Sequence, residues 1–143
     1  MGRLLGLDYG DKTIGVAISD TLNITAQSLE VIKRPNEESI KKSVARLKEI
    51  IIEYEVCKII LGYPKNMDNT VGLRAEKTTE FKERLHRNFK SMSIILWDER
   101  LSTIAVERGL YDEKLNRQKR KEVVDKLAAA YILQGYLDSK YKK

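Results

Sequence analysis

The chain is short of the residue types that mark several protein classes. Cys57 is the only cysteine and stands in an apolar segment, so we expect a buried thiol, no internal disulfide and no cysteine-based metal site. His86 is the only histidine and has charged neighbours, which favours a surface position over a histidine-based metal site or a catalytic triad. A chain with one buried thiol is typical of the cytoplasm, where we expect this one to act.

Other absences concern whole segments. No apolar run approaches the roughly 18 residues that cross a membrane, so we expect no membrane partner. The first residues lead directly into an apolar run that reads as a strand, so we expect no signal or transit peptide. Neither GxxxxGK[ST] nor GxGxxG occurs, which argues against ordinary P-loop or Rossmann nucleotide binding.

The sequence has only 2 prolines and no linker, repeat or low-complexity tract, so we expect one domain over residues 1–143. Its 27 Lys and Arg residues against 21 Asp and Glu give a net charge of +6, which favours a polyanionic partner such as nucleic acid. Five of the basic residues crowd together around the start of the last predicted helix: Lys114, Arg117, Lys119, Arg120 and Lys121. This cluster is either a phosphate-binding surface or a merely solvated loop.

Hydrophobic periodicity predicts alternating strands and helices. Three consecutive strands that can pair antiparallel, followed by strands separated by helices, indicate an α/β fold with a mixed five-stranded central sheet flanked by helices. The predicted strands are residues 3–9, 13–19, 27–33, 57–62 and 93–97, and the predicted helices are 36–54, 73–89, 102–110 and 118–140.

Acidic residues stand next to the predicted core at three places. Asp8 ends the first strand, where an ionised carboxylate is costly unless a metal, an arginine or backbone N–H groups compensate its charge. Asp98 and Glu99 follow the strand 93–97. Asp125 lies in the last helix just before three alanines at 128–130, whose small side chains would let that helix lie close to the sheet.

Two interpretations of these carboxylates stay open from the residues alone. They are unrelated charges if Asp8 caps its turn, Glu99 pairs with Arg100, and Asp125 pairs with Lys121 or Lys126. If they converge instead, their mutual repulsion calls for a cation, and oxygen ligands suit Mg²⁺ or Mn²⁺ better than zinc. Such ions support phosphodiester cleavage. Lys12 in the first turn and Arg100 would then be phosphate contacts.

An ordered series of short motifs gives the chain a family resemblance. The series runs from Gly6-Leu7-Asp8-Tyr9-Gly10 through Gly62-Tyr63-Pro64 and Asp98-Glu99-Arg100-Leu101-Ser102-Thr103 to Asp125-Lys126-Leu127-Ala128-Ala129. In these motifs the chain resembles the YqgF family, also called RuvX. The resemblance implies an RNase H-like fold and a catalytic acidic site of Asp8, Glu99 and Asp125, with Asp98 as a fourth metal ligand.

The resemblance also implies a metal-dependent nuclease that cleaves structured RNA, with the 5′ end of precursor 16S rRNA as substrate and ribosomal particles as partners. Two alternatives remain from the sequence: resolution of Holliday junctions in branched DNA, and a non-catalytic accessory factor that binds nucleic acid. An actin-like ATPase would need two lobes around its nucleotide, and 143 residues supply one. Sequence does not distinguish a monomer from a homodimer.

Overall fold

The chain begins with a three-stranded antiparallel meander. The computed structural model describes residues 2–10, 12–36, 39–64, 72–98 and 117–141, with the side chains of the last range described for residues 126–140. Strand β1 (Arg3–Tyr9) pairs antiparallel with β2 (Thr13–Ser19), and β2 pairs antiparallel with β3 (Ala26–Lys33). The Gly10 amide donates a hydrogen bond of 2.8 Å to the Thr13 carbonyl and closes the first turn.

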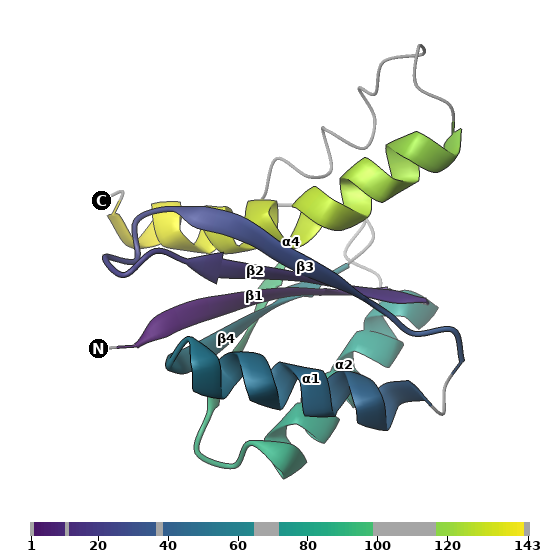
Figure 1. Cartoon of the computed structure of the whole chain (residues 1–143), viewed down its shortest axis with the longest axis horizontal. Coiled ribbons are helices and arrows are strands. Elements are labelled where there is room, and N and C mark those ends of the chain that lie inside the picture. Colours follow the sequence, from purple (N-terminus) through teal and green to yellow (C-terminus); the bar gives the residue numbers. More distant parts are fainter. Residues whose placement is uncertain (1, 11, 37–38, 65–71, 99–116, 142–143) are drawn as a thin grey trace.

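Two further strands complete the sheet on the other side of β1. Strand β4 (Val56–Tyr63) runs parallel to β1, and β5 (Ser93–Asp98) runs parallel to β4. The five strands lie in the order β3-β2-β1-β4-β5 (Figure 1). The predicted mixed five-stranded sheet is therefore confirmed, with each strand within one residue of its predicted bounds.

Helices cover both faces of this sheet. Figure 1 shows α1 (Ile40–Glu53) and α2 (Leu73–Asn88) on one face and α4 (Arg117–Tyr141) on the other. Helix α1 begins four residues later than the predicted 36, with Ser39 as its N-cap residue. The reason is local: the Asn36 side chain accepts a 3.0 Å hydrogen bond from the Ser39 amide, so Asn36 caps a separate turn before the helix. The predicted helix at 102–110 lies outside the described residues.

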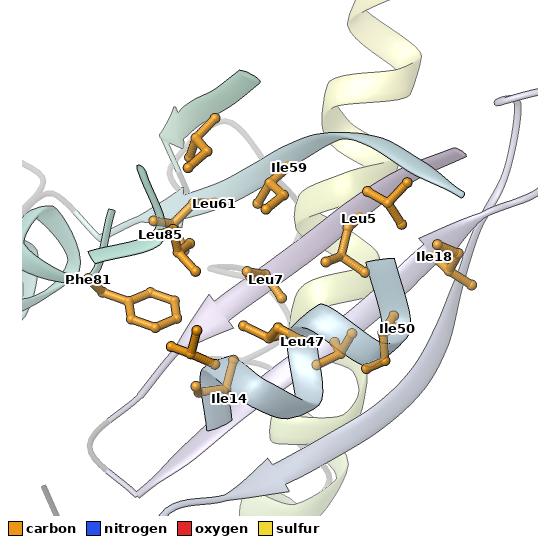
Figure 2. Packing of buried hydrophobic residues seen from close by; sticks show 14 residues of the cluster. Leu5, Leu7, Ile14, Ile18, Leu47, Ile50, Ile59, Leu61, Phe81 and Leu85 are labelled. Atoms are coloured by element: carbon orange, nitrogen blue, oxygen red, sulfur yellow. The ribbon is translucent and has the colours of Figure 1, made fainter. Parts of the chain in front are cut away.

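The core forms two layers, one on each side of β1. On the α1 and α2 side, Leu5 and Leu7 of β1 pack in a buried cluster with Leu47 of α1 and Leu85 of α2 (Figure 2). On the α4 side, a second cluster joins neighbouring strands to the helix through Leu4, Ala17, Ile60, Ala129, Ile132 and Leu133. Because β1 is buried on both faces, its residues have fixed positions right up to the strand end.

Helix α4 lies unusually close to β1 at Gly6. A Cβ atom built on Gly6 would stand 2.7 Å from the Leu133 Cβ and 2.9 Å from the Ala129 carbonyl oxygen. Helical spacing in the sequence predicts that Val124, Leu127, Ala128, Tyr131 and Gly135 face inward. Val124 lies outside the residues whose side chains are described. Of the others only Ala128 is buried, and the remaining buried positions described are Ala129, Ile132, Leu133, Tyr136 and Leu137. The close contact at Gly6 sets this rotation of the helix.

The predicted burial of Cys57 is wrong, because the thiol is exposed. Cys57 is the second residue of β4, and the alternation of side chains along a strand turns it away from the cluster that holds its neighbour Val56. His86 is exposed, as predicted. No helix among the described residues is long and apolar enough to span a membrane.

Candidate acidic site at the carboxyl edge of the sheet

Asp8 is a buried carboxylate near the end of β1. Asp8 is only 6% exposed, and it lies opposite Gly15 of β2 in the antiparallel register. The alternation that sends Leu5 and Leu7 toward α1 and α2 puts Gly6 and Asp8 on the opposite side of the strand, the side that α4 covers. Asp8 is therefore held in place by the packed layers on the two sides of β1.

Arg74 supplies a positive charge to Asp8. The Arg74 Nη2 donates to the Asp8 Oδ1 at 3.3 Å, and the arginine side chain is 41% exposed whereas that of Asp8 is 8% exposed. Arg74 is the second residue of α2, whose N-terminus lies near the end of β1. Sequence reasoning did not single out Arg74. Nothing in its local sequence indicates a partner 66 residues earlier in the chain.

Asp98 ends β5 at the same edge of the sheet. The register aligns Leu7 of β1 with Leu61 of β4, and Leu61 with Leu96 of β5. Asp8 follows this row by one residue and Asp98 by two, so both lie at the carboxyl ends of parallel strands. Strand β4 separates them, which puts their backbones roughly 10 Å apart. In parallel sheets this edge is the usual place for ligands.

The other predicted site residues fall into three groups. Glu99, Arg100 and Lys114 lie outside the described residues. Lys12 is exposed in the turn between β1 and β2. The remainder belong to α4, where the backbone is described and the side chains are not: Arg117, Lys119, Arg120, Lys121 and Asp125.

Position 125 of α4 has a defined place in the chain trace relative to β1. Asp125 precedes Ala129 by one helical turn, and the Ala129 carbonyl makes the close approach to Gly6. Lys126 is fixed at its backbone, since its carbonyl accepts a 2.7 Å hydrogen bond from the Ser28 hydroxyl of β3. Asp8 lies two residues beyond Gly6 toward the carboxyl edge, so this turn of α4 runs past the same end of the sheet.

The side chains that the structure places here fit a hard divalent cation in kind. Asp8 offers buried carboxylate oxygens and Asp98 partly buried ones, at the carboxyl ends of their strands. The register aligns Asp8 with Trp97, so side-chain alternation starts the Asp98 side chain on the face of the sheet opposite to that of Asp8. Among the described residues no group of three or more His, Cys, Asp or Glu side chains could by itself hold a metal ion. A complete set of metal ligands would have to include residues whose side chains the structure does not describe, such as Glu99 and Asp125.

Structural comparison identifies the fold. Thermus thermophilus RuvC in complex with a Holliday junction substrate matches with a TM-score of 0.58 at 15% identity, covering 99% of this chain and 96% of that one. The yeast mitochondrial Holliday junction resolvase Ydc2 matches with a TM-score of 0.52 at 11% identity, covering 95% and 78%. At such identities the likeness concerns the fold alone, which is RNase H-like.

Sequence comparison gives much nearer relatives. A protein of Agathobacter rectalis is 52% identical over 136 residues, covering 95% of this chain and 94% of the relative. A protein of Clostridium tetani is 52% identical over 141 residues, covering 99% of each. Both carry the name "Putative pre-16S rRNA nuclease". The model of the RuvX family, described as Holliday junction resolvase, matches residues 2–139. The chain therefore belongs to the RuvX family.

Proposed function

We propose that this protein is a metal-dependent nuclease that hydrolyses phosphodiester bonds in structured RNA, with the 5′ region of precursor 16S rRNA as its substrate. One observation carries the proposal: a buried carboxylate, Asp8, stands at the carboxyl edge of an RNase H-like sheet in a chain about half identical to relatives named for that activity. A buried carboxylate adds nothing to folding by itself, so its position is better explained by chemistry.

The proposed catalytic residues are Asp8, Glu99 and Asp125, with Asp98 as a further metal ligand. Support for Asp8 and Asp98 comes from their shared sheet edge. Support for Asp125 comes from the close contact between Gly6 of β1 and Ala129 of α4. From this contact, Asp8 lies two residues toward the carboxyl end of the strand, and Asp125 lies one helical turn away in the same direction. Glu99 directly follows Asp98 in the sequence.

The metal in this proposal is Mg²⁺ or Mn²⁺, held by the carboxylates just named. Such an ion, when bound, lowers the pKa of a water ligand and stabilises charge on the leaving oxygen. Asp8 would orient its carboxylate toward the ion, and burial would keep that carboxylate in one position. Arg74 would neutralise Asp8 in the metal-free protein and would then be free to contact a phosphate oxygen.

Basic side chains would hold the phosphate backbone of the substrate. They are Lys12, Arg100 and the basic cluster formed by Lys114, Arg117, Lys119, Arg120 and Lys121. Figure 1 shows the amino-terminal turns of α4, which carry four of these residues, extending away from the sheet. We propose that residues 1–143 form one nuclease domain that acts in the cytoplasm, on ribosomal precursor particles.

A second candidate is the resolution of Holliday junctions in branched DNA. It is favoured by the description of the family model and keeps the same acidic site. A non-catalytic accessory factor would bind nucleic acid through the same basic residues without a working metal site.

The test is a cleavage assay with two substrates, a precursor 16S rRNA fragment and a four-way DNA junction, in Mn²⁺, in Mg²⁺ and in EDTA. The proposal predicts cleavage of the RNA in either metal and none in EDTA. Cleavage of the junction alone would replace it with the resolvase. Binding of either substrate with no cleavage in any metal would replace it with the accessory factor.

A further inference from the structure

A groove beside the acidic site is not explained by the carboxylates. It has a volume of about 590 Å³ and lies between the β1–β2 turn, the segment before α1, and one side of α2. Five basic residues line it: Lys12, Arg34, Lys77, Arg84 and Arg87. Two acidic residues also line it, Glu80 and Glu83, so its side chains carry a net charge of three positive units (five minus two).

Arg34 is the most unusual of the five, since it is a buried cation, only 5% exposed. Its Nη2 donates to the Gly10 carbonyl at 2.7 Å, and its guanidinium stands 4.7 Å from the centre of the Tyr9 ring. Its Nε is buried and finds no hydrogen-bond partner among the described residues. No carboxylate of the described residues pairs with Arg34, so its charge adds to the potential at the groove wall.

Two stacked aromatic rings line the groove. Tyr9, the last residue of β1, stacks on Phe81 of α2 with ring centres 4.2 Å apart and planes 12° from parallel. Tyr9 directly follows Asp8 in β1, so the groove begins at the same strand end as Asp8, on the face of the sheet that α2 covers. Arg34 is tied to the same turn, since its amide donates a 2.6 Å hydrogen bond to the Lys12 carbonyl.

Basic residues follow one another along α2, leading away from Asp8. Arg74 contacts Asp8, Lys77 lies one helical turn further, and Arg84 and Arg87 follow toward the helix end. From Arg74 to Arg87 the helix rises about 20 Å. Neither Arg84 nor Arg87 forms an ion pair with a carboxylate of the described residues, so both can meet an external anion.

We infer that this groove binds the phosphodiester backbone of the nucleic-acid strand that leads away from the bond cleaved at Asp8. The inference rests on the proposed nuclease function and adds a strand path along α2, separate from the predicted cluster at residues 114–121. An extended row of cations over a buried positive charge suits a polyanion better than a single small anion. Because the contacts are to phosphate, we expect RNA and DNA strands to use the groove alike.

The test compares two double variants of the full-length protein. Arg84→Gln/Arg87→Gln removes two groove charges, and the control Lys48→Gln/Lys90→Gln removes two exposed charges that do not line the groove. Binding is measured by fluorescence anisotropy in EDTA, so that no cleavage occurs, with a labelled RNA hairpin and a labelled four-way DNA junction over a range of salt concentrations. Circular dichroism checks that both variants are folded.

The groove variant should bind roughly tenfold more weakly or worse at 0.1 M salt, and the slope of log K against log salt should fall by about 1.5, the value for two lost phosphate contacts. The control should keep the wild-type slope. In the cleavage assay the groove variant should show a raised KM and a kcat close to wild type, since these arginines do not touch the reacting bond.

Each other outcome overturns the inference. If the groove variant had the same salt slope as wild type, or if the control lost as much affinity as the groove variant, the groove would not be part of the binding surface. The nuclease proposal would stand in either case if the wild-type protein still cleaves. A groove variant that loses kcat with KM unchanged would contradict a strand-binding role. Wild-type protein that binds neither probe at low salt would refute both proposals together.

Discussion

At the scale of single residues, the contact with Arg74 gives the buried Asp8 carboxylate a positively charged partner in the absence of a metal. The Arg74 Nη2 and Asp8 Oδ1 atoms are 3.3 Å apart, and the arginine side chain is partly exposed to solvent. We therefore expect the pair to contribute much less to the free energy of unfolding than a fully buried ion pair. Its importance is that Arg74 and a divalent cation would serve the same carboxylate. Metal binding and the arginine contact should therefore be coupled.

The Arg74→Ala variant should lose about 1 kcal/mol of unfolding free energy in EDTA. Part of this loss should be recovered in saturating Mn²⁺, because a bound cation stabilises the folded state by mass action. Urea unfolding in both conditions measures this, with Arg87→Ala as a control for removing a cation from an exposed position of the same helix. A loss no larger than that of the control, or one unaffected by Mn²⁺, would contradict the coupling.

The residues that carry the site were only partly predictable. Asp8 was found from sequence because an acid at the end of an apolar strand is conspicuous. Arg74 and Arg34 were not found, because each looks like an ordinary surface cation. Their roles come from long-range contacts, Arg74 with Asp8 and Arg34 with Gly10 and Tyr9, that only the packing of α2 and β3 creates.

At the scale of elements, the contact between β1 and α4 determines how the sheet edge meets the helix. Gly6→Ala should be destabilising by about 1–3 kcal/mol, because the added methyl group would overlap Leu133 and the Ala129 carbonyl. Chemical denaturation measures the loss. Gly10→Ala is the control, since its Cβ would meet nothing nearer than the Thr13 carbonyl at 3.2 Å, and it should cost less. Equal costs would mean that α4 does not rest on Gly6 as described.

The loop between β2 and β3 depends on ionised Asp20. The Ile24 and Thr25 amides donate to the Asp20 Oδ1 at 2.7 Å and 3.1 Å, and these hydrogen bonds hold the pKa of Asp20 below its ordinary value. A carboxyl with a lowered pKa in the folded state stabilises the fold at pH values above its unfolded pKa. That contribution disappears as the pH falls through the lowered pKa.

Asp20→Asn should therefore be less stable than wild type at neutral pH, with the difference shrinking to nothing in strong acid. Urea unfolding of both proteins from about pH 7 down to about pH 2 tests the sign. A difference that stays constant over this range would show that the charge of Asp20 is not what matters.

Strand bounds were well predicted from sequence because alternation and apolar runs mark them directly. Helix details were less predictable, since they depend on partners. The start of α1 moved because Asn36 bonds the Ser39 amide, and the buried side of α4 was set by Gly6 of another element. The Cys57 prediction failed because a strand residue faces whichever layer the alternation assigns, whatever its own hydrophobicity.

At the scale of the whole molecule, two core layers hold β1 between α1 and α2 on one side and α4 on the other. This arrangement fixes the carboxyl edge where Asp8 and Asp98 lie. The groove along α2 begins at that edge, and its net positive charge agrees with the overall charge of +6. The fold thus places an acidic edge and a basic groove side by side, as a nuclease for a polyanionic substrate requires.

The most direct test of the central claim is cleavage by the Asp8→Asn variant. The variant keeps the size of the side chain and removes its charge. Asp138→Asn is the matched control, an exposed aspartate in the last turns of α4. Single-turnover cleavage of the precursor 16S rRNA fragment in Mn²⁺ should fall by a factor on the order of 10³ or more for Asp8→Asn, with substrate binding largely kept, and stay at the wild-type rate for Asp138→Asn. Full activity of Asp8→Asn would contradict the assignment of Asp8 to a catalytic metal site.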